Sequence, residues 1–275
     1  MSVTDVRRCF SGQVAIVTGG SAGIGRDVCT RLAARGARLA IVGRDAGRLE
    51  RARQESIARG AGPDDVLTLR LDVRDESDMD EMAARSRERF GRIDILVHSA
   101  GMLRPAGAGL MRLDQTPPEI WDEVVRTNLR GTYLANRAVL PAMIEQRAGD
   151  ILNLSSKSGR RGLAFDGPYC ASKFGVIGLT EAIAEEVKSF GVRVQVLCPG
   201  TFETGVWGQA GPLPRPGNLP PSSRVADAIV FLLSLPRDAC IPSPDVEPVC
   251  SLAETGWRGG ARGGGRSGGR VEIAP

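Results

Sequence analysis

The feature that most constrains the fold is a glycine-rich segment between an apolar run and a helix pattern. Residues 14–17 read Val-Ala-Ile-Val, a short stretch typical of a buried strand. The next eight residues, Thr18 to Gly25, read T-G-G-S-A-G-I-G, and Ile24, Val28 and Leu32 continue at helical spacing. This order places free N–H groups and the positive end of a helix dipole beside a backbone that a pyrophosphate can approach. We expect a dinucleotide-binding unit; the alternative is a tight turn without a ligand.

Strand and helix patterns alternate along the rest of the chain. Helix patterns separate short apolar runs that are typical of buried strands, at 39–42, 66–71, 93–97, 150–154 and 192–197. Strands separated by helices indicate a parallel sheet with right-handed crossovers and helices on both faces. A last strand at 246–250 contains Pro248, which would restrict it to a sheet edge. We therefore predict one α/β domain, a doubly wound Rossmann fold with a parallel sheet of about seven strands.

This domain is predicted to cover residues 13–255, after a loose lead-in at 1–12 and before a Gly/Arg-rich tail at 256–275. The tail holds four arginines and no acid between residues 256 and 270, which equals the net charge of +4 for the whole chain. The remainder is neutral and gives no sign of a polyanion partner. The tail resembles Arg/Gly segments of RNA-binding proteins, but it is short and has a single aromatic residue, Trp257, so we favour an inert, disordered extension and no nucleic acid partner.

Composition is that of an ordinary globular protein, with 42% apolar and 25% charged residues. No run approaches the roughly 18 apolar residues that a membrane span requires. The first ten residues are charged and lack an apolar h-region, so we expect no secretory signal. The six cysteines form no C-x-x-C and the chain has one histidine, which argues against a metal site. We expect a cytoplasmic protein with reduced thiols and no membrane segment.

The end of the second strand bears on the choice of cofactor. NAD-binding sites usually place a carboxylate there, about 20 residues after the glycines, to bind the ribose 2′-hydroxyl. Here the position is Gly43, and Arg44 follows it. A guanidinium matches the geometry of a phosphate, and Ser21 would be a second donor to it. We therefore expect NADP(H) to be preferred, with NAD(H) possible; the alternative is that Arg44 only caps a surface turn.

A second candidate cluster lies between Ser156 and Lys173. Tyr169 and Lys173 are four residues apart, so on a helix they share one face. An ammonium beside a phenol lowers the pKa of the phenol and makes Tyr169 a candidate proton donor or acceptor. Ser156 follows a predicted strand, at the sheet edge where α/β enzymes keep their sites. Taken alone, the Tyr–Lys pair could be a chance match on an amphipathic helix.

Together these motifs resemble those of the short-chain dehydrogenase/reductase family, in particular its branch of about 250 residues that includes acyl carrier protein ketoreductases. The resemblance covers residues 13–235. Its motifs occur in order: T-G-x-x-x-G-x-G at 18–25, Asp72-Val73, Ala100-Gly101, Asn128, Ser156, Tyr169-x-x-x-Lys173 and Pro199-Gly200. The cofactor site expected from these motifs and from the second strand end comprises Thr18, Gly19, Ser21, Gly23, Ile24, Gly25, Arg44, Asp72, Val73, Ala100, Gly101, Tyr169, Lys173, Pro199, Gly200 and Thr204.

The resemblance also implies catalytic roles for four residues. Tyr169 would protonate the substrate oxygen, Lys173 would lower the pKa of that tyrosine and bind the nicotinamide ribose, and Ser156 would hold the carbonyl oxygen. Asn128 would hold a water that links Lys173 to solvent. The implied activity is reduction of a ketone to a secondary alcohol by NADP(H), or the reverse. The alternatives are a non-catalytic scaffold of the same fold and RNA association through the tail.

The chain departs from the family pattern at three places. His98-Ser99 stands where an Asn pair is usual, and we interpret His98 as a structural hydrogen-bonding residue. Ala22 stands where many NADP-preferring members have a basic residue. The C-terminal region lacks the V-D-G-G ending of many tetrameric members, so a homodimer is as well supported as a homotetramer.

Three segments are expected to line the substrate pocket: residues 102–111, the residues after Ser156, and residues 201–214. Residues 102–118 form a loop that leaves a strand end and borders the site, and a helix at 119–146 follows, with Asn128 in its first half. Residues 205–222, with Trp207, are expected to form a lid. Because these segments carry no cluster of charge, we expect a modest apolar ketone or β-ketoacyl group as substrate.

Overall fold

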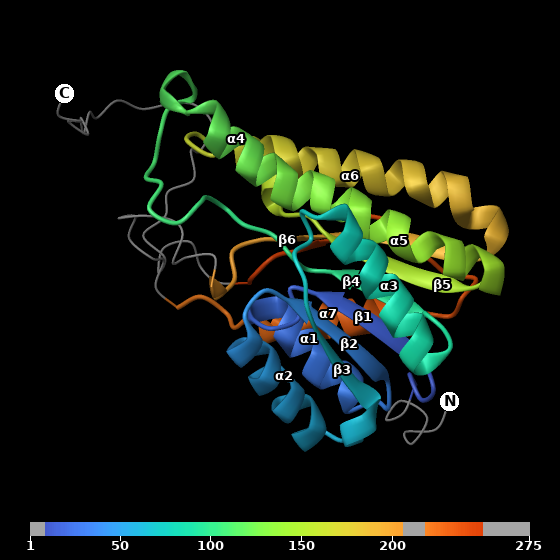
Figure 1. Cartoon of the computed structure of the whole chain (residues 1–275). Coiled ribbons are helices and arrows are strands. Elements are labelled where there is room, and N and C mark those ends of the chain that lie inside the picture. The colour runs from blue at the N-terminus through green and yellow to red at the C-terminus, as the bar shows by residue number, and fades with distance from the viewer. Residues whose placement is uncertain (1–8, 206–217, 250–275) are drawn as a thin grey trace.

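In the described part of the chain, seven parallel strands form one sheet in the order β3-β2-β1-β4-β5-β6-β7 (Figure 1). The computed structural model describes residues 9–205 and 218–249. The lid residues 206–217, the Gly/Arg-rich tail and most of the lead-in therefore lie outside the described residues. The sheet and its covering helices confirm the predicted doubly wound α/β fold.

The strands lie close to their predicted positions. They are β1 Val14–Thr18, β2 Arg38–Gly43, β3 Val66–Arg70, β4 Ile95–His98, β5 Gly149–Leu154, β6 Val192–Pro199 and β7 Asp245–Val246. The helices between and after them are α1 Gly23–Ala33, α2 Ala46–Ala58, α3 Glu76–Phe90, α4 Pro118–Val125, α5 Gly131–Gln146, α6 Gly167–Val187 and α7 Ser223–Ser234. No helix among the described residues is long and apolar enough to cross a membrane.

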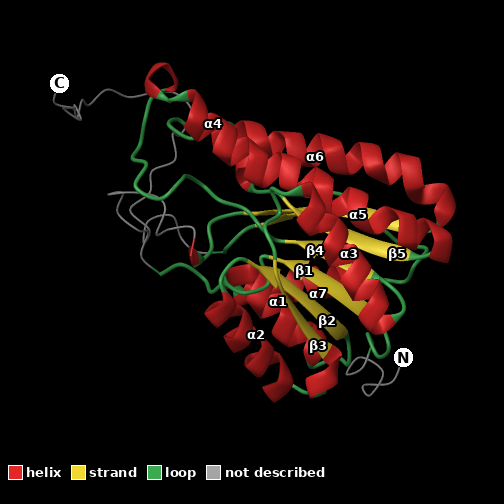
Figure 2. Cartoon of the chain, in the orientation of Figure 1, coloured by secondary structure: helices red, strands yellow, loops and turns green. Residues whose placement is uncertain are grey.

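Helices cover both faces of the sheet, and the strand sequences show why (Figure 2). Successive side chains of a strand point to opposite faces. In β1, Ala15 and Val17 pack in the core with α1, α2 and α7, whereas Ile16 packs in the core with α3, α5 and α6. Because both faces are buried, the strands are continuous apolar runs rather than alternating ones.

The chain reverses its direction of winding at β1. It runs from β1 outward to β3, then returns to place β4 on the other side of β1. The loops after β1 and β4 therefore separate above the carboxyl end of the sheet, which is where open α/β sheets bind ligands. The long loop after β4 leaves this edge and leads to α4 (Figure 1).

Two predicted elements are wrong in detail. The single helix expected at 119–146 is interrupted by a π-helical turn, Arg126–Arg130, in which the Gly131 N–H donates to the Arg126 carbonyl five residues earlier. The last strand is only Asp245–Val246, paired with β6, and Pro248 lies beyond it. A proline cannot donate to a ladder, so the short strand ends before it.

Candidate active site

The glycine loop after β1 packs with almost no room for side chains. A Cβ on Gly19, whose φ is +65°, would lie 2.8 Å from the Ala100 nitrogen, and a Cβ on Gly25 would lie 2.4 Å from the Gly19 carbonyl oxygen. Helix α1 has Ala22 at its N-cap, no capping side chain and no acidic residue in its first turn. Its first N–H groups and positive dipole end are thus left for an anion. These features fit the pyrophosphate of a dinucleotide.

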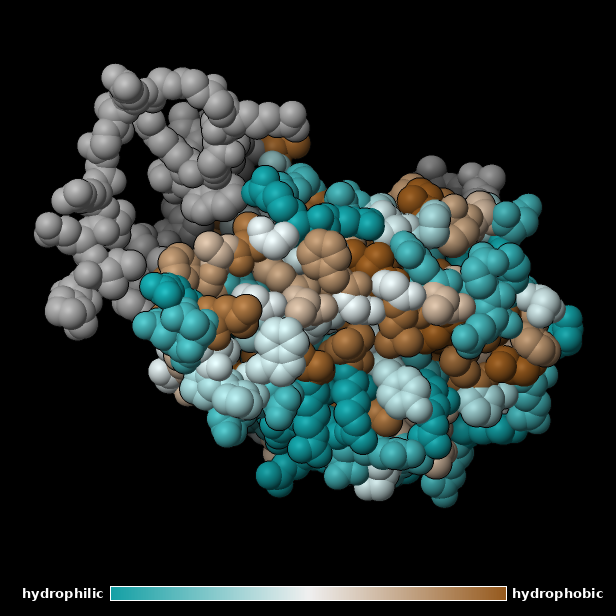
Figure 3. Space-filling model, turned by 90° about the horizontal axis from the view of Figure 1, so that it is seen from above, coloured by the Kyte–Doolittle hydropathy of each residue, from teal (hydrophilic) through white to brown (hydrophobic). Residues whose placement is uncertain are grey.

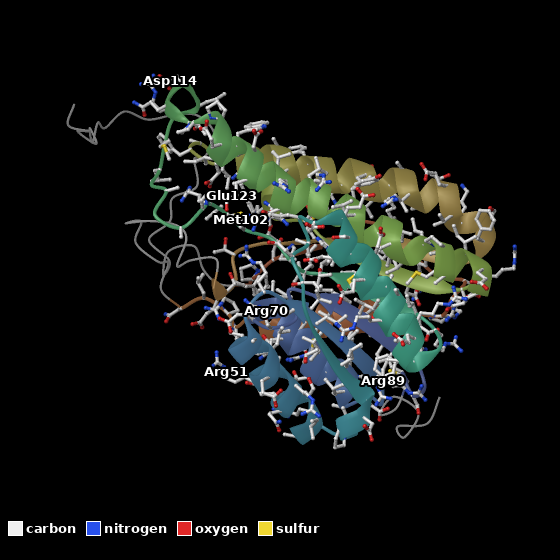
Figure 4. The ribbon with its side chains drawn as sticks, in the orientation of Figure 1. Arg51, Arg70, Arg89, Met102, Asp114 and Glu123 are labelled. Atoms are coloured by element: carbon white, nitrogen blue, oxygen red, sulfur yellow. The ribbon has the colours of Figure 1, made fainter. Side chains whose placement is uncertain are left out.

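Ser21 lies against the end of β2. A Cβ on Gly43 would lie 2.7 Å from Ser21 Oγ, so a larger residue at position 43 would require the Ser21 side chain to shift. Arg44 follows with a side chain that is 67% exposed, and its Nη1 lies 3.8 Å from Asp72 Oδ2. Figure 4 places Arg70 at this same end of the sheet, and its Nε donates to the Arg44 carbonyl at 3.2 Å.

Asp72 and Val73, two of the predicted cofactor residues, follow β3. The Asp72 carboxylate is held by Arg74, whose Nη2 donates to Oδ2 at 2.6 Å and whose N–H donates to Oδ1 at 3.0 Å. Val73 is buried, and a Cβ on Gly131 would lie 3.0 Å from its Cγ2. Arg74 was not predicted, since nothing in its spacing marks it.

Thr18 joins the ends of β1 and β4. Its hydroxyl lies 2.9 Å from His98 Nδ1 and accepts the Ala100 N–H at 3.4 Å. His98 is 1% exposed, and burial, together with the charge of Lys173, lowers its pKa to about 3. A histidine that stays neutral at physiological pH fits the structural role predicted for it. Its Nε2 has no hydrogen-bond partner among the described residues.

Lys173, Asn128 and Gly101 meet beneath the candidate reaction centre. A Cβ on Gly101 would lie 3.5 Å from Lys173 Nζ and 3.2 Å from Asn128 Oδ1. Lys173 Nζ donates to the Leu154 carbonyl at 2.8 Å. Burial lowers the pKa of Lys173 to about 8, so it remains largely charged at neutral pH yet can release a proton.

Asn128 connects three parts of the site. Its Oδ1 accepts the Met102 N–H at 2.8 Å, and its Nδ2 donates to the Met102 carbonyl at 2.8 Å and to Ser172 Oγ at 3.0 Å. The π-helical turn carries this fully buried side chain, and such turns often mark functional positions. Figure 4 shows Met102 at the carboxyl edge of the sheet, below Glu123 of α4. Both amide donors are occupied, so the side chain fastens the loop after β4 to α6.

Ser156 and Tyr169 bring two hydroxyls together. Ser156 lies after β5, and its Oγ accepts the Ser158 N–H at 3.2 Å. Burial raises the pKa of Tyr169 to about 12, while a hydrogen bond with Ser156 acts in the opposite direction. The predicted lowering of the Tyr169 pKa by Lys173 is wrong for this structure. Lys173 Nζ lies 5.8 Å from the centre of the Tyr169 ring and is bonded to Leu154, so it does not offset the burial.

The segment after β6 completes the edge of the site. Pro199 pairs with Val246, and the Gly200 N–H donates to the Val246 carbonyl at 2.8 Å. A Cβ on Gly200 would lie 2.6 Å from Glu247 Oε2, so the backbone approaches that side chain closely. Thr204 follows at a partly exposed position and is the last predicted cofactor residue.

A small pocket opens in front of Tyr169. Its lining is mainly apolar and comes from the loop after β4, from α4 and from the start of α6: Leu103, Arg104, Gly109, Met111, Thr116, Ile120, Val124, Phe165, Asp166, Pro168 and Tyr169. The sequence interpretation placed the loop here but did not single out Arg104 and Asp166, which form an ion pair across the pocket. They are 62 residues apart, and no spacing pattern links them.

Comparisons with known proteins show which family this chain resembles. The short chain dehydrogenase family model matches residues 13–212. The 2-(R)-hydroxypropyl-CoM dehydrogenase of Xanthobacter autotrophicus is 39% identical over 232 residues, which cover 80% of this chain and 90% of that protein.

Solved structures show the same fold. Levodione reductase matches with a TM-score of 0.78 and 29% identity, covering 90% of this chain and 100% of that one. A metagenomic short-chain oxidoreductase in complex with NADP matches with a TM-score of 0.75 and 31% identity, covering 88% of this chain and 99% of that one. The chain therefore belongs to the short-chain dehydrogenase/reductase family, and it is an oxidoreductase of the class that uses nicotinamide cofactors.

Proposed function

We propose that this chain is an NADP(H)-dependent oxidoreductase that reduces a ketone to a secondary alcohol, or catalyses the reverse reaction, with Tyr169 as the acid/base. The observation that carries the proposal is the pairing of the Ser156 and Tyr169 hydroxyls, with Lys173 Nζ 5.8 Å from the centre of the Tyr169 ring, at the sheet edge that also holds the glycine loop. The alternative of a non-catalytic scaffold gives no reason for these groups to converge.

The side chains suit a proton transfer at the substrate oxygen. Tyr169 would donate its hydroxyl proton to that oxygen, while the Ser156 hydroxyl orients and polarises the carbonyl. Because burial holds the pKa of Tyr169 near 12, the protonated form dominates at neutral pH, as a proton donor requires. Lys173, with its pKa lowered by burial to about 8, is the group able to resupply the proton. A bound nicotinamide supplies the hydride chemistry, and this chain supplies position and proton.

The groups at the end of β2 support a preference for NADP(H). Position 43 is a glycine and carries no carboxylate for a 2′-hydroxyl, and the Ser21 hydroxyl lies where its Cβ would be. Arg44, exposed at the same edge, would pair with a 2′-phosphate. One relative of known structure was solved with NADP bound.

The pocket in front of Tyr169 supports a substrate of modest size and low charge. Its walls are mostly apolar, and its two charged residues, Arg104 and Asp166, pair with each other. This composition favours an uncharged ketone, or a β-ketoacyl group, over a phosphorylated or acidic substrate.

The face formed by α4, α5 and α6 supports a homo-oligomer. Trp121, Tyr133 and Phe174 expose 37%, 46% and 47% of their surface on these helices. Figure 3 views the molecule from this side and shows brown and pale residues across its middle. Apolar surface of this kind commonly marks a contact between protein copies.

The central test replaces Tyr169 with phenylalanine. Tyr169→Phe removes the proton donor and keeps the ring, so turnover of ketones with NADPH should fall by about 10²–10⁴-fold. The loss is measured as the rate of decrease of the reduced-nicotinamide absorbance over a panel of ketones. Affinity for NADPH, measured by fluorescence titration, should change little.

The chain offers a matched control, because Tyr133 is its only other tyrosine. Tyr133→Phe, at a half-exposed position on α5, should leave both turnover and NADPH affinity unchanged. NADPH binding without turnover of any ketone by the unaltered chain would favour the scaffold alternative.

A further inference from the structure

A buried ion pair lies beside Tyr169 and has no part in the proton transfer proposed above. Arg104, in the loop after β4, hydrogen-bonds Asp166, the residue before α6. Their side chains are only 7% and 18% exposed, and both line the pocket that contains Tyr169. A buried ion pair is often no more stabilising than an apolar pair of similar volume. Its place in the pocket therefore points to a role other than stability.

The backbone before α6 indicates that the Arg104–Asp166 pair constrains the turn that leads into this helix. Asp166 occupies the N-cap position, where an aspartate usually accepts a hydrogen bond from its own helix. Here its side chain makes no such bond and turns to Arg104 instead. The preceding residue, Phe165, has φ +68°, a left-handed conformation that is rare for a bulky residue. Strained backbone of this kind persists only where surrounding contacts enforce it.

We propose that Arg104 and Asp166 are positioning residues: Arg104 fastens the Asp166 carboxylate to the substrate loop and neutralises the charge that it presents to the Tyr169 hydroxyl. The inference rests on the proposed function, in which this hydroxyl exchanges the proton. Arg104, in the loop after β4, would thereby influence how readily Tyr169 on α6 releases its proton.

Among the groups around Tyr169, the Arg104–Asp166 pair is the one whose charge can be changed without replacing a proposed catalytic residue. Ser156 hydrogen-bonds the hydroxyl and Lys173 lies over the ring. Burial raises the pKa of the Cys170 thiol, so this neighbour is neutral. Helix α4 contributes only the apolar Ile120 and Val124 to the pocket.

The Asp166 carboxylate acts on Tyr169 in a known direction. After burial, the largest contribution, the negative charge of Asp166 further raises the pKa of Tyr169. Arg104 opposes it, because a cation beside a carboxylate cancels most of its field at a distance. Removing either partner should therefore move the Tyr169 pKa, and the two changes should have opposite signs.

The first experiment compares the pH dependence of kcat/KM for alcohol oxidation, in which Tyr169 must be ionised. Asp166→Asn removes the Asp166 anion while the Arg104 cation stays, and should shift the rising limb to lower pH by about one unit. Arg104→Gln leaves the Asp166 anion unopposed and should shift it to higher pH by about one unit. The double variant Arg104→Gln/Asp166→Asn and the conservative Arg104→Lys should both lie near the parent profile.

The second experiment needs no substrate. In a Tyr133→Phe background, Tyr169 is the only tyrosine, so tyrosinate absorbance reports this residue alone. At a fixed alkaline pH at which circular dichroism shows an intact fold, Asp166→Asn should contain about tenfold more tyrosinate than the parent. Adding Arg104→Gln should restore the parent value, and this double variant avoids a lone buried charge that would threaten folding.

The two experiments separate the failure of this inference from that of the proposed function. Opposite shifts in the single variants, cancelled in the double variant, support the positioning pair. Shifts of the same sign, or tyrosinate unchanged in Asp166→Asn, overturn it and leave a structural contact. If the tyrosinate measurements gave the expected pattern but the chain oxidised no alcohol, the positioning role of Arg104 and Asp166 would stand and the proposed function would be refuted.

Discussion

At the scale of single residues, burial controls the chemistry of this site. His98, Tyr169 and Lys173 each have a pKa displaced in the direction that disfavours the charged form. The consequence differs among them: His98 stays neutral, Tyr169 stays protonated as a donor, and Lys173 lies close to the point where it exchanges protons at physiological pH. The glycine loop, the loop after β4 and α6 together create this environment.

The neutral state of His98 predicts a specific acid sensitivity. Its pKa is about 3 in the folded chain and about 6.5 when unfolded, so the unfolded state binds more protons between those values. The folding stability that depends on neutral His98 is therefore complete above pH ~6.5 and falls by about 1.4 kcal/mol per unit below it.

His98→Asn should remove this dependence. Denaturant unfolding at pH 7 and pH 5 should show a loss of stability about 2 kcal/mol smaller in the variant than in the parent. An equal loss in both chains would mean that His98 is accessible to protons in the fold. Asn can still bond the Thr18 hydroxyl, so the strand ends should stay joined.

Arg44 predicts a change in cofactor choice. Arg44→Ala removes the guanidinium beside the proposed 2′-phosphate position and should weaken NADPH by about tenfold or more, with little effect on NADH. Fluorescence titration with each cofactor measures the two dissociation constants. Arg51→Ala, on the neighbouring helix α2, is the matched control and should change neither. Equal losses for NADPH and NADH in Arg44→Ala would refute the NADP preference.

At the scale of elements, the site depends on helices that begin or change pitch close to it. Helix α1 starts without a cap beside the glycine loop, and α6 begins with a diverted N-cap aspartate three residues before Tyr169. Between α4 and α5, the π-helical turn widens one turn and directs Asn128 inward. All three features lie beside the candidate site and place backbone groups or side chains in it.

Substitution of Gly25 tests how closely α1 must pack against the glycine loop, and Gly178 in α6 is the control. Gly25→Ala would place a Cβ 2.4 Å from the Gly19 carbonyl oxygen and should cost about 1–3 kcal/mol while weakening NADPH binding. Gly178→Ala, at an exposed position in α6 with nothing within 4 Å, should instead stabilise the chain by about 0.5–1 kcal/mol. Urea unfolding and NADPH titration measure both. If Gly25→Ala changed neither the free energy of unfolding nor the affinity for NADPH, the glycine loop would have to relax away from α1.

At the scale of the whole molecule, one buried arginine joins helix α7 to the sheet. Arg193 of β6 donates to Asp150 of β5 at 2.6 Å. The other arms of its guanidinium donate to the carbonyls of Leu233, Leu235, Pro236 and Ala239 at and beyond the end of α7. This contact fixes the segment that leads to the edge strand β7.

Arg193→Met should therefore destabilise the chain strongly. It leaves the buried Asp150 carboxylate unpaired, at a cost of about 3–5 kcal/mol. Arg137→Met, which breaks an exposed pair with Glu76, is the control and should cost about 0–1 kcal/mol. Urea unfolding free energies give the comparison, and similar losses in the two variants would contradict the assignment of Arg193 as the main connection.

The local sequence was sufficient for the outline of this protein. Apolar runs and glycine turns locate the strands within a few residues, because a strand buried on both faces must be apolar throughout. The order of the motifs identified the family and the edge of the sheet where the candidate residues gather. Those inferences rest on short-range patterns, namely the spacing along a helix, the end of a strand and the absence of side chains in a turn.

Only the tertiary structure decided the environments of those residues. The raised pKa of Tyr169, the neutral state of His98 and the ion pair of Arg104 with Asp166 all arise from groups distant in the sequence. Burial and charge depend on what surrounds an atom in three dimensions. Spacing could therefore name Tyr169 and Lys173 as partners, but the fold alone determined that the lysine bonds a carbonyl of β5 and leaves the tyrosine protonated.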